Sequence, residues 1–77
     1  MSKQIDEIRK KYGEPMLRMG IDHVIGVGIN NLKDVNADEV CARILKETPA
    51  NSIMTPEFSA ELMRCAIELS QISIGDI

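Results

Sequence analysis

The sequence predicts a small, mainly α-helical domain of three or four helices that spans residues 1–77. Two segments, 36–47 and 56–72, combine the apolar spacing of amphipathic helices with suitable capping residues. The chain has 77 residues, and 44% of them are apolar. This apolar content suffices for one thin core, and a chain of this length is too short for a multi-domain enzyme. Tyr12 and Phe58 are the only aromatic residues, so aliphatic side chains must fill that core.

The first predicted helix covers residues 3–12. Its apolar residues recur at three- and four-residue spacing, which places them on one face: Ile5, Ile8 and Tyr12. Gly13 suits the positive-φ position that ends many helices, and Pro15 interrupts regular continuation. We therefore expect a boundary or a kink at residues 13–15.

Residues 23–29, HVIGVGI, are consistent with a strand or a helix. β-Branched residues favour a strand, and two glycines inside a helix would cost about 1 kcal/mol each. A helix would instead carry a continuous apolar stripe: Ile21, Val24, Ile25, Gly28, Ile29 and Leu32. The strand is favoured, which adds one short strand or hairpin around 23–29 to the helical domain. The alternative fold class is α+β, with this strand pairing between molecules.

The second well-defined helix is predicted at residues 36–47. Asn36 is a suitable N-cap, and Glu39 stands three residues later, as in a capping box. Pro49 prevents the helix from continuing. The predicted buried stripe contains Val40, Cys41, Ile44 and Leu45.

The last predicted helix, residues 56–72, is expected to be the hub of the core. Thr55 is its N-cap and Pro56 takes the first helical position. Its main stripe contains Phe58, Leu62, Cys65, Leu69 and Ile72. Met63 and Ile67 add a second stripe, so this helix has to bury more than one narrow seam.

The charge and the cysteine content reduce the number of candidate functions. Nine Lys and Arg residues stand against twelve Asp and Glu residues, giving a net charge of −3. Nucleic-acid binding needs clustered basic residues, so a nucleic-acid-associated regulator is only the second alternative function. Two cysteines in apolar surroundings indicate reduced thiols and a cytoplasmic protein. We expect no signal peptide, and no segment is long enough to span a membrane.

The residues that could carry catalysis or hold a metal are few and widely separated. His23, Cys41 and Cys65 lack the close spacing of a zinc site, and an apolar setting would leave both thiols inert. Gly26-Val27-Gly28 supplies only part of a nucleotide-binding fingerprint. We therefore expect no enzyme activity, no metal and no cofactor.

One segment carries a family resemblance. Ala50-Asn51-Ser52-Ile53-Met54 precedes a predicted helix and resembles the Asp-Ser-Leu site at which acyl carrier proteins receive a phosphopantetheine group. Asn51 stands in place of the aspartate, and too few residues follow Ser52 for the remaining helices of that family. The resemblance implies the first alternative function, a small carrier or ligand-binding domain modified at Ser52.

The leading prediction is a non-enzymatic protein-interaction module that regulates or inhibits a larger protein, by docking on it or as a homodimer. The apolar segment around 23–29 and the doubly striped last helix offer more apolar surface than one small chain covers. The predicted partner-binding residues are Ile25, Val27, Ile29, Met63 and Ile67. A strand would bind by β-augmentation, and a helix would bind through a groove.

Overall fold

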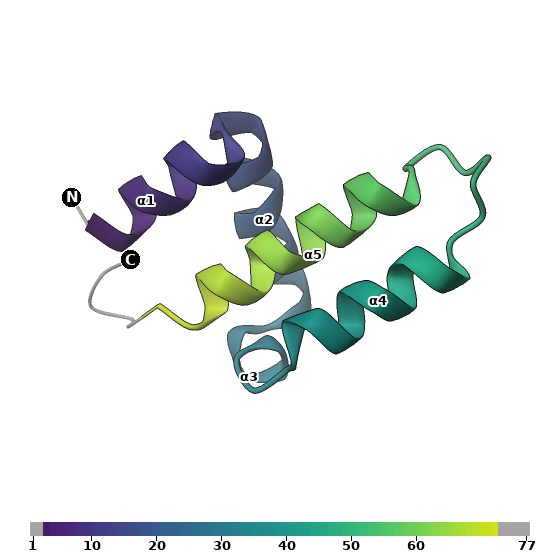
Figure 1. The fold of residues 1–77 in the computed structure, drawn as a ribbon. Helices are drawn as coiled ribbons and strands as arrows, with labels where there is room; N and C mark the ends of the chain where they lie inside the picture. The colour runs from purple at the N-terminus through teal and green to yellow at the C-terminus, as the bar shows by residue number, and fades with distance from the viewer. Residues whose placement is uncertain (1–2, 73–77) are drawn as a thin grey trace.

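The computed structural model describes residues 3–72, and these residues form five helices and no strand. The helices, in chain order, are α1 (Lys3–Tyr12), α2 (Glu14–Val27), α3 (Ile29–Leu32), α4 (Ala37–Glu47) and α5 (Pro56–Ser70). The mainly helical fold class is confirmed. Figure 1 shows α4 and α5 running side by side, with α2 crossing behind α5 and α1 on the opposite side from the α4–α5 connection.

The strand expected around residues 23–29 is wrong. Helix α2 continues through this segment to Val27, and Gly28 ends it with a φ of +100°. The Gly28 N–H donates to the Val24 carbonyl at 2.7 Å, which satisfies one of the last carbonyls of the helix. Tertiary packing of α2 on α5 thus outweighs the strand preference of the β-branched residues.

The close crossing of α2 and α5 depends on Gly20. A Cβ atom at this position would lie 2.9 Å from the Cys65 Sγ and 3.0 Å from the Leu69 Cδ1. Because only glycine leaves room for these atoms, α2 can approach α5 closely where the two helices cross. This contact buries Leu17 and Val24 of α2 against α5.

Helix α5 is the hub of the core, as predicted. It contacts each of the other four helices, whereas α4 contacts α5 alone among the described helices. The main core cluster is Ile8, Met16, Leu17, Val24, Leu32, Cys65, Ala66, Ile67, Leu69 and Ile72. Cys41 is also buried, but Leu45 of the predicted α4 stripe is 49% exposed, because α4 has only one neighbour to bury it.

The predicted helix caps are present. The Asn36 side chain accepts a hydrogen bond from the Glu39 N–H at 3.1 Å, and the Thr55 hydroxyl accepts one from the Phe58 N–H at 3.1 Å. Each bond satisfies an amide that the first turn of a helix leaves without an intrahelical partner. The caps therefore define where α4 and α5 begin.

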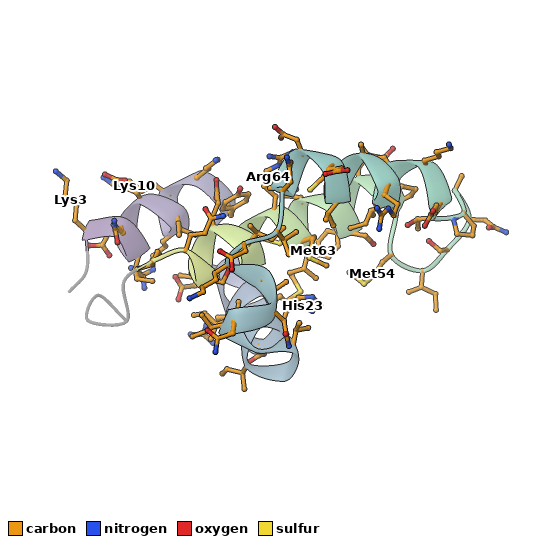
Figure 2. The ribbon with its side chains drawn as sticks, turned by 90° about the horizontal axis from the view of Figure 1, so that it is seen from below. Lys3, Lys10, His23, Met54, Met63 and Arg64 are labelled. Atoms are coloured by element: carbon orange, nitrogen blue, oxygen red, sulfur yellow. The ribbon has the colours of Figure 1, made fainter. Side chains whose placement is uncertain are left out.

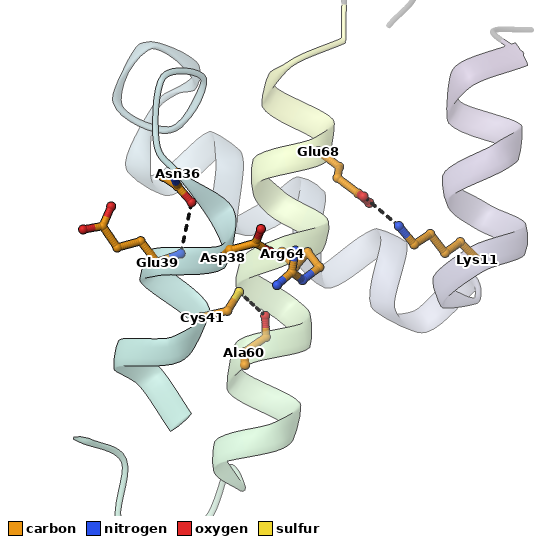
Figure 3. Close-up of polar contacts among 8 residues, drawn as sticks. All are labelled: Lys11, Asn36, Asp38, Glu39, Cys41, Ala60, Arg64 and Glu68. Carbon is orange, nitrogen blue, oxygen red and sulfur yellow. Dashed lines mark hydrogen bonds and ion pairs between the residues drawn. The ribbon is translucent and has the colours of Figure 1, made fainter. Parts of the chain in front are cut away.

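Two ion pairs tie neighbouring helices to α5 (Figure 3). Lys11 Nζ of α1 lies 2.8 Å from a Glu68 carboxylate oxygen, and Arg64 Nη1 lies 2.9 Å from an Asp38 oxygen of α4. Surface pairs of this kind contribute about 0–1 kcal/mol each, so the apolar core supplies most of the stability.

Candidate partner-binding groove

An apolar cavity of about 160 Å³ opens between four of the helices. Its lining, called the groove below, consists of Ile5, Ile21, Val24, Ile25, Ile29 and Leu69. Val24 and Leu69 are buried and form its floor. Ile25, at the rim, is 75% exposed, although it is one of the more apolar side chains in the protein.

The turn between α2 and α3 places two groove residues next to each other. Gly28 reverses the backbone, and the Asn31 side-chain amide donates to the Val27 carbonyl at 2.7 Å. These two features hold α3 against the end of α2. Ile29 consequently lies beside Ile25 at the edge of the groove.

The far wall of the groove comes from α1, whose angle to α2 is set at Gly13. The Gly13 φ of +93° allows the sharp turn between the two helices. Arg9 then contacts Asp6 on α1 and Glu14 on α2, both at 2.7 Å. The contact with Glu14 links the two helices on the exposed side of the turn, and Ile5 lines the groove opposite α2.

The structure brings together two of the five predicted partner-binding residues. Ile25 and Ile29 both line the groove, because the turn at Gly28 places the start of α3 beside the end of α2. Val27 is exposed but turned away from the groove, since the strand alternation that grouped it with them does not apply.

The remaining two predicted residues lie on α5, outside the groove. Met63 is partly buried against the core, and Figure 2, which views the molecule from below, shows it near the centre of the view. Ile67 is 1% exposed and packs in the main core cluster, so its side chain does not reach the surface of this chain. The second apolar stripe of α5 thus packs largely against the protein's own core.

Four groove residues were missing from the predicted partner-binding set. Ile5, Ile21, Val24 and Leu69 come from three different helices, and each fits an ordinary buried stripe in the sequence. Only the packing of α1, α2 and α5 brings them together. The helical stripe that contains Ile21, Ile25 and Ile29 was the one sequence signal for the groove.

A second exposed apolar region lies at the connection between α4 and α5, at the right-hand end of the molecule in Figure 1. Ile53 is fully exposed (105%), and Met54 is also exposed. The Ser52 N–H donates to the Pro49 carbonyl at 3.1 Å, and the Ser52 hydroxyl donates to the Met54 carbonyl. We call residues 49–54 the loop tip, and these bonds hold its backbone in a defined turn.

The two cysteines are free thiols within the helical core. The Cys41 thiol donates to the Ala60 carbonyl at 3.3 Å (Figure 3), and the Cys65 thiol lies 3.8 Å from the Met16 carbonyl. Burial, followed by the nearby carboxylates of α5, raises the pKa of the Cys65 thiol to about 11. This thiol therefore stays protonated near neutral pH, which disfavours nucleophilic chemistry.

Within residues 3–72, no three His, Cys, Asp or Glu side chains come together in a group that could hold a metal ion. In the same part of the chain, no helix has the length and apolar character needed to cross a membrane. The chain matches no protein-family model, no curated protein and no solved structure.

Proposed function

We propose that this chain is a non-enzymatic protein-interaction module, and that it regulates or inhibits a protein partner by docking it in the groove. The observation that carries the proposal is the groove itself: a preformed cavity, lined only by aliphatic side chains, beside an isoleucine that is 75% exposed. Complete burial of an isoleucine side chain is worth roughly 1.5–3 kcal/mol. Covering Ile25 therefore offers a partner one strong contact.

The surroundings of the groove support the same proposal. Arg18 and Asp22 lie on the exposed side of α2, next to the apolar lining, and the Arg18 side chain is 77% exposed. An apolar centre with a charged rim is the usual arrangement of a protein interface. Because the described residues contain no strand, the groove favours a helix or a loop as its occupant over an added strand.

The proposal is tested by co-purification from cells that express tagged and untagged copies of the chain. Wild type is expected to retain a protein, either another protein or the untagged copy. Ile25→Asp is expected to lose it, because a charged side chain at the rim would have to be desolvated. Leu45→Asp is the matched control, since Leu45 is an exposed aliphatic residue on α4, away from the groove. If nothing is retained, or Ile25→Asp retains the same proteins, the proposal is wrong.

A further inference from the structure

The loop tip presents an apolar side chain with no cover. Among residues 3–72, Ile53 is the large apolar residue with the greatest exposed fraction. The backbone around Ile53 is restrained: Pro49 begins the loop tip, Pro56 follows it closely, and Ser52 makes both hydrogen bonds that shape the turn. An apolar side chain held on a defined turn loses little conformational freedom on binding, which favours its use as an anchor.

Ile53 cannot reach the groove of its own chain. The loop tip precedes the first turn of α5, whereas Leu69 of the groove lies near the end of this helix. A helix of 15 residues is about 22 Å long, and it separates the two sites along the longest dimension of the molecule, 38 Å. An Ile53 side chain that occupies the groove must therefore come from a second molecule.

We propose that the loop tip of one copy docks in the groove of a second copy, with Ile53 inserted between Ile21, Ile25 and Ile29. This inference rests on the proposed function of the groove and names its occupant. The sizes agree: the groove has a volume of about 160 Å³, and an aliphatic cavity of about 150 Å³ accepts a benzene-sized group. The four-carbon side chain of isoleucine is smaller than benzene.

One charged residue beside the groove is complementary to the acidic residues on either side of the loop tip. The loop tip contains no charged residue, and the first ones on either side of it are acidic, Glu47 and Glu57. Arg18 stands at the rim of the groove, and its contact with Glu14 is long, at 3.6 Å. Glu47 or Glu57 of the incoming copy can form an ion pair with Arg18. Asp22, which lies one turn further along α2, repels these carboxylates.

The contact joins two different surfaces, so it is heterologous. After one contact forms, one copy of the pair still has a free groove and the other copy still has a free loop tip. Such contacts produce rings when the rotation closes and open chains when it does not. We therefore expect assemblies that grow with protein concentration instead of stopping at a fixed dimer.

The test is a complementation experiment by light scattering with two variants. Ile53→Asp keeps its groove but loses the anchor, and Ile25→Asp keeps the anchor but loses the groove. Each variant alone is expected to associate at least about tenfold more weakly than wild type. Mixed in equal amounts, they are expected to form a pair of twice the 8.6 kDa chain mass and nothing larger, since only one productive contact remains.

Circular dichroism first establishes that both variants fold, as expected for two exposed positions, and Leu45→Asp serves as the control that should assemble like wild type. If Ile25→Asp abolishes assembly while Ile53→Asp assembles like wild type, the groove binds something other than Ile53. That result overturns this inference and leaves the proposed function intact. A mixture that stays at 8.6 kDa, or a wild type that does so at every concentration, also overturns it.

Discussion

Two glycines of α2 occupy opposite environments. An added Cβ at Gly20 would meet Cys65 and Leu69 of α5 at 3.0 Å or less, whereas a Cβ at Gly26 would meet nothing within 4 Å. Gly20 therefore allows the helices to cross closely. Gly26 contributes no packing and carries only the conformational cost of a helical glycine.

Alanine substitution should separate these roles. Gly26→Ala is expected to raise the free energy of unfolding by about 0.5–1 kcal/mol, because alanine restricts the unfolded chain and meets open space. Gly20→Ala is expected to lower it by about 1–3 kcal/mol, because α2 and α5 must move apart. Urea denaturation of both variants measures the difference. Equal effects of the two substitutions would show that the crossing does not depend on Gly20.

Because the Cys65 thiol is buried, the free energy of unfolding is expected to vary with pH in the alkaline range. Its pKa in the folded protein is raised to about 11, chiefly by burial, whereas a thiol in an unfolded chain titrates near pH 8.5. Above about pH 9 the unfolded chain therefore binds fewer protons than the folded one. The free energy of unfolding should fall as pH rises, by up to about 1.4 kcal/mol per pH unit, until the pH reaches the folded pKa.

Denaturation of Cys65→Ala between about pH 8 and pH 10 tests this account. The variant should be less stable overall, because it leaves a small cavity, but its stability should decline less steeply with pH. Tyr12, whose pKa burial and Glu68 raise well above its usual range, acts in the same direction above about pH 10. An unchanged pH slope in Cys65→Ala would show that the thiol is not the group responsible.

At the scale of the elements, the beginning of α4 depends on one side chain. Asn36→Ala removes the acceptor for the Glu39 N–H and is expected to cost about 1 kcal/mol of stability. Asn36→Asp keeps an acceptor and adds a negative charge at the positive end of the helix, so it should be within about 0.5 kcal/mol of wild type. Chemical denaturation followed by circular dichroism compares them. Equal losses for both substitutions would contradict a capping role.

Three helices could be predicted from the sequence because their ends carry local signals. Asn36 and Thr55 accept the bonds expected of N-caps, and Gly13 has the positive φ expected after α1. These signals depend on neighbouring residues alone. The predicted bounds 36–47 and 56–72 therefore agree with α4 and α5 to within two residues.

Helix α2 could not be predicted with the same success, because its stability comes from distant residues. Within residues 23–29, local preferences favour a strand, and the deciding contact is the fit of Gly20 against Cys65 and Leu69. The groove could not be predicted for the same reason, because it is formed by residues that are distant in the sequence. Ile25 and Ile29 were identifiable from their spacing, but Leu69 joins them only after α2 has packed across α5.

At the level of the whole molecule, the burial of a leucine side chain determines how much it contributes to stability. Leu17 is 1% exposed between α2 and α5, whereas Leu45 on α4 is 49% exposed. Leu17→Ala is expected to cost about 2–5 kcal/mol, and Leu45→Ala less than about 1 kcal/mol. A chain of this length has a total stability of about 4–12 kcal/mol. Urea denaturation should therefore show a large loss for the first variant only, and comparable losses would contradict the core described above.

The two ends of the molecule present different apolar features. Helix α5 collects the core, its first turns follow the exposed loop tip, and its last turns provide the floor of the groove. An anchor at one end and a receptor for it at the other are the requirements for assembly from a single type of chain. The central claim is that these two ends meet in solution.

The most direct test is a series of NMR spectra of the wild-type chain, recorded from tens of micromolar to about 1 mM. Association through these two ends is expected to produce concentration-dependent shifts at both sites: the groove residues Ile5, Ile21, Val24, Ile25, Ile29 and Leu69, and the loop tip at residues 49–54. Signals from the exposed face of the first two turns of α4 should stay unchanged. Spectra that superimpose at all concentrations, or shifts confined to α4, would contradict it.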